Sequence, residues 1–403
     1  MQRILKGLQR FSGQFWLCMM AILLFEIGQS STWPYMALFI QKKLNVPLSA
    51  AAMSISVKPI FGVIASLFAG SITDRLGRKL IVCAAFLGLS VNFLLMRIVS
   101  TSWLVISLLA LLGMLEVALP VGVNTMITDL TSPEELQQGY AIYKVFFNIG
   151  YSIGPVLGGY MAVRSYDSLF TLIALMFLAA WALLQAVLKE SGKYRQQAAS
   201  ENVISGLLAV YRDKLYLRII ILLVFVYITT YSPFNLLSSY ANKAGGFTED
   251  LISIVFTVNA AAAAILQIPG TGLVKNRKPI KVLLLTTMIY GLSCIGFVFF
   301  SSIPWYCVCI IGYSIGEVFL HPAVMDISVR LAPPEAVGRY VSLNNLAAQL
   351  ANALGIMILG FCFDTISPQS IWWVGSSFSL VTLFGLLVMM RRYSSEVRFQ
   401  KIN

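Results

Sequence analysis

The stretch that decides the fold reads Gly70-Ser-Ile-Thr-Asp74-Arg75-Leu-Gly77-Arg78-Lys79, and it lies between two long apolar runs of a 403-residue chain. Each charge in this stretch would cost about 3 kcal/mol in the hydrocarbon core of a bilayer. The stretch is therefore expected to form a tight turn at a membrane surface. Gly70 is expected to let two helices approach closely, and Gly77 to permit the chain reversal. Asp74 can cap a helix or pair with a neighbouring cation.

The composition supports a membrane protein. The chain is 58% apolar and only 11% charged, whereas a soluble chain carries about 25% charged residues. The apolar residues occur in runs of roughly 18 to 25, the length that crosses a bilayer core. The net charge of +12 does not indicate nucleic-acid binding, because the cations lie in short loops between the apolar runs.

Twelve membrane spans are expected. The first follows a basic segment that could pass for a signal peptide, but its apolar run is too long and no small-residue cleavage site follows it. The fold class is therefore an all-α polytopic membrane protein. The spans are expected at residues 15–40, 48–70, 79–98, 103–128, 139–163, 168–189, 217–242, 250–273, 280–301, 303–329, 338–364 and 370–391.

The distribution of cations predicts the orientation. With both termini cytoplasmic, the cytoplasmic side holds 22 cations and the outer side 5, as the positive-inside rule requires in a cell membrane. The longest polar stretch, at about 189–218, is expected to be a cytoplasmic linker with an amphipathic surface helix near 203–217. The predicted organisation is a six-helix bundle over 1–189, a linker over 190–216 and a second six-helix bundle over 217–403.

The two halves of the chain repeat. A shift of 201 residues places Glu116 on Glu317, and a shift of 202 places Asp74-Arg75 on Asn276-Arg277, in a weaker copy of the charged turn. A repeat of half the chain length predicts two bundles related by a pseudo-twofold axis.

The charged turn resembles the signature loop between helices 2 and 3 of the major facilitator superfamily. The match covers Gly70, Asp74, Arg75, Gly77, Arg78 and Lys79. The resemblance implies a twelve-helix transporter that works by alternating access and usually as a monomer. Asp129, at the end of the fourth span, resembles the acid that pairs with the arginine of this loop and latches the outward-open state.

The fifth span carries a glycine-rich motif, Gly150-x-x-x-Gly154-Pro155-x-x-Gly158-Gly159. Glycines three and four residues apart form a smooth helix face, and the proline interrupts the hydrogen-bond ladder. The motif resembles the glycine-proline motif of the drug-exporting antiporters. The match is partial, because the family pattern begins nine residues earlier, where this chain has Ala141. Ordinary small-residue helix packing is the alternative.

Five ionisable residues lie inside the spans. The acids Glu26, Glu116 and Glu317 fall in spans 1, 4 and 10, which line the central cavity in the resembled fold. A carboxyl group in such a cavity can bind a proton or a cationic substrate but not both, and this competition would produce antiport. Structural ion pairs with Lys58 or Lys144 are the alternative for Glu26 and Glu116. No buried cation is evident near Glu317, which favours a functional role.

His321 is the single histidine of the chain and lies four residues after Glu317, on the same helix face. Histidine changes charge in the physiological pH range, so the two groups are expected to titrate together. A histidine that is hydrogen-bonded near the Pro322 break is the alternative. The segment around Glu317 resembles span 10 of proton-coupled multidrug transporters, where an acid contacts substrate. Asp326 and Arg330 are expected to form a structural pair.

One feature departs from the resembled branch. Its antiporters usually carry an arginine in span 4, four residues before a glycine, but this chain has Leu109 before Gly113. The coupling role of that arginine therefore does not carry over.

Buried amides need partners, which a cavity wall supplies as water or substrate. The amides in spans 7, 8 and 11 are Asn235, Asn259, Gln267, Asn344, Asn345, Gln349 and Asn352.

The sequence thus predicts a proton-coupled multidrug exporter of small hydrophobic, cationic or zwitterionic compounds, with protons and membrane lipids as its other partners. The alternative is a transporter of a lysolipid, sugar, peptide or anionic metabolite, with or without proton coupling, in which Lys58 and Lys144 bind an anion. No enzyme activity, cofactor, metal or nucleic acid is expected. The chain has one histidine, no cluster with metal-ligand spacing and no nucleotide-binding glycine loop.

Overall fold

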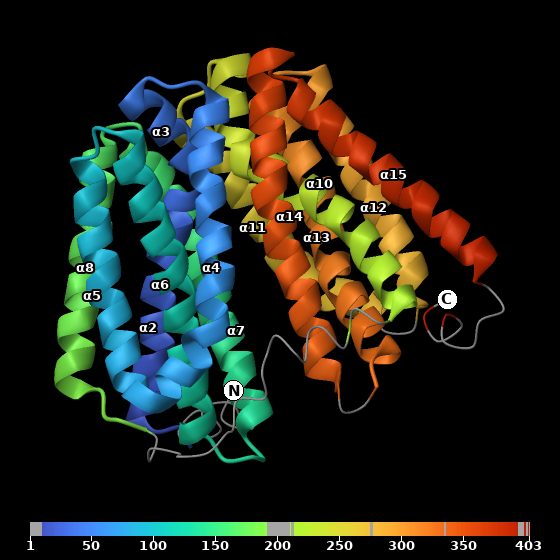
Figure 1. Ribbon diagram of the computed structural model, residues 1–403. Helices are drawn as coiled ribbons and strands as arrows, with labels where there is room; N and C mark the ends of the chain where they lie inside the picture. The colour runs from blue at the N-terminus through green and yellow to red at the C-terminus, as the bar shows by residue number, and fades with distance from the viewer. Residues whose placement is uncertain are drawn as a thin grey trace. The chain divides into compact units, whose positions relative to one another are not determined.

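The computed structural model describes residues 10–191, 210, 213–274, 277–333, 336–393, 399 and 402, and the regular elements within these ranges are helices (Figure 1). The elements are α2 (Gly13–Thr32), η1 (Trp33–Tyr35), α3 (Met36–Leu44), α4 (Leu48–Leu76), α5 (Arg78–Arg97), α6 (Ser102–Leu130), α7 (Leu136–Ala162), α8 (Tyr166–Val187), α10 (Lys214–Gly245), α11 (Glu249–Val274), α12 (Pro279–Phe299), α13 (Ile303–Leu331), α14 (Val337–Thr365) and α15 (Ser370–Arg392).

The expected membrane spans are confirmed as helices. Within the described residues, 11 helices are long and apolar enough to cross a membrane, with α2, η1 and α3 counted as one span. The other expected span is α7, which is more polar because it carries Gln137, Gln138 and Lys144. The predicted surface helix near 203–217 lies mostly outside the described residues, as does Asn276 in the second copy of the charged turn.

Several helices begin where the sequence supplies a capping side chain. Ser12, Thr101, Ser165 and Asp213 each accept a backbone N–H from the first turn of the helix that follows. Such caps satisfy N–H groups that have no partner inside the helix. The apolar runs between these caps form the spans.

The chain forms two compact units. Unit 1 comprises Met1–Trp33 and Ile60–Ser200, and unit 2 comprises Pro34–Pro59 and Glu201–Asn403. The chain passes from one unit to the other at a 3-10 turn that contains Pro34 and at Pro59 inside α4. The bundles expected over 1–189 and 217–403 remain a prediction, and they differ from these units chiefly in the segment Pro34–Pro59.

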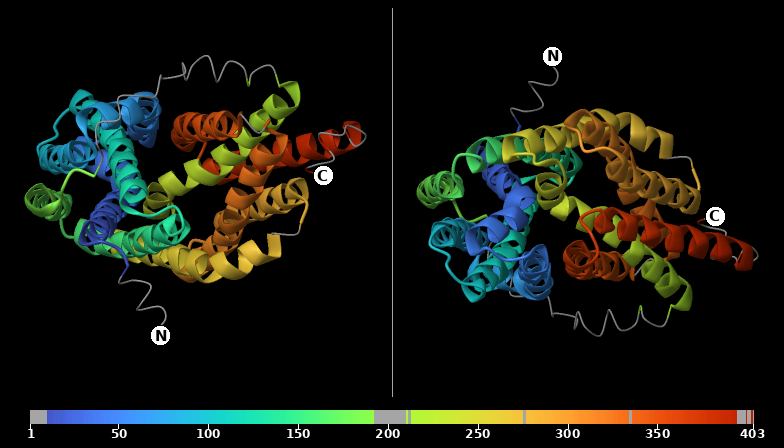
Figure 2. Two further views of the ribbon diagram at one scale, coloured as in Figure 1. Left: turned by 90° about the horizontal axis from the view of Figure 1, so that it is seen from below. Right: turned by 90° about the horizontal axis from the view of Figure 1, so that it is seen from above.

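Equivalent helices pair in the same way inside each unit. In unit 1, α2 packs on α7, and α5 packs on both α6 and α8; α5 and α8 lie side by side at one edge (Figures 1 and 2). In unit 2, α10 packs on α14, and α12 packs on both α13 and α15. These are the pairings expected from a sequence repeat of half the chain length.

Two carboxylates fix the segment Pro34–Pro59 within unit 2. Glu249 is buried, and its Oε1 lies 2.7 Å from the Nζ of Lys42. Asp364 accepts the backbone N–H groups of Leu48 and Ser49 at 3.3 and 2.6 Å. Asp364 therefore caps the start of α4 from the far end of α14.

Candidate functional site

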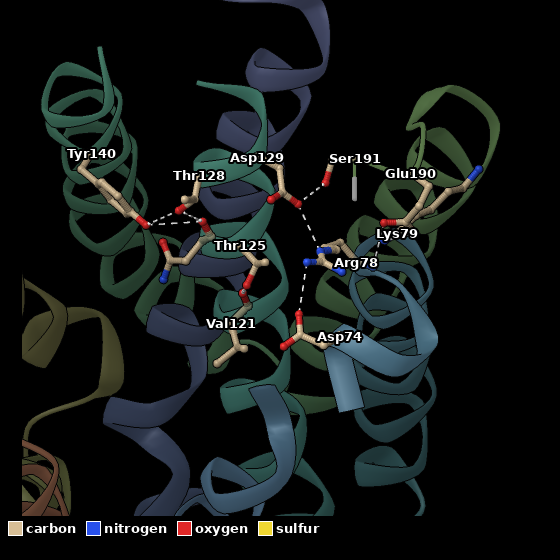
Figure 3. Close-up of polar contacts among 11 residues, drawn as sticks. Asp74, Arg78, Lys79, Val121, Thr125, Thr128, Asp129, Tyr140, Glu190 and Ser191 are labelled. Carbon is tan, nitrogen blue, oxygen red and sulfur yellow. Dashed lines mark hydrogen bonds and ion pairs between the residues drawn. The ribbon is translucent and has the colours of Figure 1, made fainter. Parts of the chain in front are cut away.

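A buried arginine holds the turn between α4 and α5. Gly77 has a φ of 95°, a backbone conformation that strains any residue with a Cβ. Glycine adopts it without strain, and this allows the predicted chain reversal. The side chain of Arg78 is 6% exposed, and its Nε and Nη2 lie 3.1 Å from carboxylate oxygens of Asp129 and Asp74, respectively (Figure 3). We call this set of three residues the Arg78 network. The two carboxylates offset much of the cost of keeping the guanidinium charge away from water.

The Arg78 network extends to the end of α8 through two residues that the sequence reading missed. Glu190 accepts the backbone N–H groups of Arg78 and Lys79 at 2.9 and 3.1 Å, so it caps α5 (Figure 3). Ser191 donates its hydroxyl to Asp129 at 3.0 Å. The turn is therefore joined to α6 and to the residues after α8.

One residue of the signature loop differs from what the sequence predicts. Gly70 was expected to bring two helices close together, but a Cβ there would meet open space. The close approach lies instead at Gly77, where a Cβ would come within 2.6 Å of the Glu190 carboxylate. Arg75 is exposed, and within the described residues the ion pairs of the loop with Asp74 and Asp129 both use Arg78.

The glycine motif of α7 packs directly on α2. A Cβ at Gly150 would lie 2.8 Å from the carbonyl oxygen of Leu23, and one at Gly158 would lie 2.0 Å from that of Ser31. A Cβ at Gly154 would lie 1.8 Å from the hydroxyl of Ser30. The motif thus brings two backbones into contact inside unit 1, as small-residue faces do in membranes. Pro155 and Gly159 are buried in the same helix.

The remaining candidates in the first half of the chain occupy different surroundings. Glu26 is 5% exposed beside Gly150, at the contact between α2 and α7. Glu116 is half-buried in α6, and Lys58 lies in the part of α4 that belongs to unit 2. Lys144 is exposed, with its Nζ 4.1 Å from the centre of the Phe147 ring. The ion pairs suggested for Glu26 and Glu116 remain predictions.

Glu317 and His321 share a cavity inside unit 2. Both side chains are exposed, and the cavity has a volume of about 110 Å³. That volume has room for several ordered waters or a small substrate group. The cavity is lined by residues of α10, α12, α13 and α14: Tyr227, Tyr231, Tyr290, Glu317, Leu320, His321, Val324, Met325, Asn344, Asn345 and Ala348.

The aromatic wall of the cavity is held in place by packing and by one amide. Tyr227 and Tyr231, one helical turn apart on α10, are stacked with ring centroids 5.7 Å apart. The hydroxyl of Tyr227 donates to Oδ1 of the buried Asn344 at 2.7 Å. Gly316 leaves space for the Tyr290 ring, which would lie 2.9 Å from a Cβ there. A carboxylate beside fixed aromatic faces suits a cation.

The residues that follow Glu317 on α13 include a proline and an ion pair. Pro322 lies inside α13, where it lacks the N–H that would bond the preceding turn. The expected pair of Asp326 with Arg330 is confirmed, with 2.6 Å between Oδ1 and Nε. Within the described residues, no group of three or more His, Cys, Asp or Glu side chains could hold a metal ion.

Comparisons with known sequences agree with this architecture. The family model of the Major Facilitator Superfamily matches residues 18–355 and 219–402. The chain is 24% identical to the uncharacterized MFS-type transporter YqjV of Bacillus subtilis, over 92% of this chain and 91% of that protein. It is 22% identical to the multidrug resistance protein MdtH of Yersinia enterocolitica, over 90% of this chain and 91% of that protein.

Solved structures show the same fold at lower identity. The nucleoside transporter NupG superposes with a TM-score of 0.83 at 12% identity, covering 94% of this chain and 100% of that chain. A POT family transporter in complex with a thioalcohol-conjugated peptide superposes with a TM-score of 0.76 at 14% identity, covering 94% and 96%.

Proposed function

The chain belongs to the major facilitator superfamily of membrane transporters, and from this premise we propose that it is a proton-coupled exporter of hydrophobic cationic or zwitterionic compounds. The observation that carries the proposal is the cavity of unit 2, where the exposed carboxylate of Glu317 lies among Tyr227, Tyr231 and Tyr290. Glu317 would bind either a proton or the cationic group of the substrate.

Competition for one carboxylate supplies the coupling in this scheme. A proton that enters from the acidic side neutralises Glu317, and the cation loses its counter-charge and leaves. Release of that proton on the other side restores the site for the next substrate. His321, in the same cavity, would be a further site for protons or substrate, as would Glu26 and Glu116.

Two further observations support export. The glycine motif of α7 packs on α2 in unit 1, and a motif of this kind is typical of the drug-exporting branch. Relatives at 22–24% identity include proteins named multidrug resistance proteins MdtH and MdtG. In this proposal the Arg78 network stabilises one state of an alternating-access cycle, and both termini face the cytoplasm.

Glu317→Gln tests the proposal, because it keeps the shape of the side chain and removes the carboxylate. In proteoliposomes that contain ethidium and are placed under an imposed pH gradient, we expect proton-driven ethidium transport to fall at least 100-fold. The matched control is Glu134→Gln, which removes a carboxylate from an exposed loop between α6 and α7. Unchanged proton-driven transport by a folded Glu317→Gln protein would contradict the proposal.

A further inference from the structure

Helix α14 carries two exposed faces of different chemistry. The exposed apolar face includes Leu350, Leu354 and Phe361. A second face of the same helix carries polar residues. On a helix that turns about 100° per residue, the centre of this polar face lies roughly 140° around the helix axis from the centre of the apolar face. The polar stripe consists of the exposed Ser342, Asn345 and Gln349 and the half-buried Asn352.

The two faces need different surroundings. Leu354 and Phe361 are well placed to face lipid, whereas an exposed amide in hydrocarbon would leave donors and acceptors unpaired at a high cost. The side chains of Asn345 and Gln349 make no hydrogen bond or ion pair within the described part of the chain. The polar stripe therefore faces water.

The polar stripe meets the cavity that contains Glu317 at Asn345. Asn345 lines that cavity together with Glu317, and Gln349 lies one helical turn further along the same face. Asn352 is another turn beyond and accepts the Nδ2 of Asn235 on α10 at 3.2 Å. The stripe thus forms a polar path between the cavity and the contact of α14 with α10.

The amides of α14 divide into two roles. Asn344 is buried and accepts the Tyr227 hydroxyl, so it positions the aromatic wall. Asn345 and Gln349 instead keep their donors and acceptors available. An amide offers both kinds of group and can therefore bind hydroxyl, carbonyl or amide groups alike.

We propose that Asn345 and Gln349 determine substrate specificity by hydrogen-bonding uncharged polar groups of the substrate while Glu317 holds its cationic group. This inference rests on the proposed function of the same cavity. From Asn345 to Asn352 the stripe spans about 10 Å of helix. The favoured substrate is accordingly an extended amine that carries hydroxyl, carbonyl or amide groups away from the charge, and not a bare lipophilic cation.

The first experiment tests whether the polar stripe faces water and needs no substrate. Asn345→Cys and Gln349→Cys are treated in liposomes with a cationic, membrane-impermeant methanethiosulfonate, and labelling is resolved by peptide mass spectrometry. Leu354→Cys and Phe361→Cys are the controls on the apolar face. We expect labelling at least tenfold faster at the two amide positions. Equal rates on both faces would overturn the inference.

The second experiment tests specificity with two probes. Doxorubicin is an amine with several hydroxyl and carbonyl groups, whereas tetraphenylphosphonium is a cation without hydrogen-bonding groups. We expect Gln349→Met and Asn345→Leu to raise the KM for doxorubicin about tenfold and to change that for tetraphenylphosphonium less than twofold. Leu354→Met, on the apolar face, is the control and should change neither KM.

The outcomes separate the inference from the proposed function. If the wild type transports neither probe under a pH gradient, the proposed function fails, and the substrate specificity inferred from it fails as well. If the wild type transports both but the two variants lose both equally, or lose neither, the proposed function survives and the specificity role of Asn345 and Gln349 is wrong.

Discussion

The helix pairs α2–α7 and α10–α14 occupy the same place in the two repeats and share a glycine–serine contact, Gly154 with Ser30 and Gly355 with Ser232. The other contacts of the two pairs differ. In unit 1, Gly150 and Gly158 of α7 bring its backbone against carbonyl groups of α2. In unit 2, the corresponding pair has one close glycine, Gly355, which faces the hydroxyl of Ser232. The rest of that contact includes hydrogen bonds such as that of Tyr227 with Asn344.

The difference indicates that the two equivalent helix pairs have different structural roles. Two backbones in direct contact leave no room for water or a ligand, so α2–α7 is suited to forming a sealed wall. A contact built from amides and hydroxyl groups allows polar side chains to continue onto the exposed face, as the stripe of α14 does. The repeat thus preserves the helix pairing while it changes the chemistry of the contact.

The ion pairs at the ends of the equivalent helices α6 and α13 also differ between the units. Arg78 is buried and bonds carboxylates from α4 and α6. At the position of Asp129 in the repeat, unit 2 has Arg330, whose side chain is 43% exposed and pairs with Asp326 in its own helix. The first network joins separate helices, whereas the second is a local pair on a helix surface.

The largest expected effect comes from placing a methyl group in the glycine contact between α7 and α2 of unit 1. Gly158→Ala places a Cβ 2.0 Å from a backbone carbonyl, which cannot move without shifting α2. We expect a loss of about 3 kcal/mol in the free energy of unfolding. Gly355→Ala meets the Ser232 hydroxyl, which can rotate away, and the Ser232 Cβ at 2.9 Å, so it should cost about 1 kcal/mol. Unfolding in mixed SDS and dodecyl maltoside micelles measures both variants.

A matched control for these variants is Gly338→Ala in α14, where a Cβ would meet open space. This change should leave the protein equally or slightly more stable, because alanine favours a helix. The contrast between the units would be refuted if Gly355→Ala proved as destabilising as Gly158→Ala.

The next effect compares the two arginines. Arg78→Met leaves two carboxylates close together without their shared cation, so we expect a loss of about 2 kcal/mol, less than for a fully buried pair because both carboxylates reach solvent. Arg330→Met breaks one exposed pair and should cost less than about 0.5 kcal/mol. The same micelle unfolding measures both. Equal losses would mean that the Arg78 network is no stronger than a surface pair.

Much of this architecture follows from patterns within single segments. The apolar runs predict the spans because bilayer thickness sets their length, and the four-residue spacing of Asp326 and Arg330 predicts their ion pair. The pairing of Arg78 with Asp129 was anticipated only as an acid bonded to the loop arginine, through the family resemblance. The sequence also anticipated that Glu317 and His321 would share one helix face.

The contacts that sequence reasoning missed depend on tertiary approach. Glu190 follows α8 by three residues, in a stretch whose charges predicted only a linker, and it caps a helix that begins 112 residues earlier. Asp364 caps α4 across 316 residues. No local pattern marks a carboxylate as a cap when the helix it caps is distant in sequence, because only the folded unit brings the two together.

Weakening either of these two distant caps is expected to have a smaller effect than removing Arg78. Glu190→Gln keeps one acceptor oxygen for the N–H groups of Arg78 and Lys79 and loses the second, together with the negative charge at the start of α5. We expect a loss of about 1 kcal/mol in micelle unfolding, typical of a helix N-cap. Asp364→Asn removes the corresponding oxygen at the start of α4 and should cost a similar amount.

Because Glu190 also lies beside the Arg78 network, the double variant Glu190→Gln, Arg78→Met should lose less than the sum of the single changes. Full additivity would mean that the cap and the buried arginine stabilise the turn independently, and the extension of the network to the end of α8 would then have no energetic meaning.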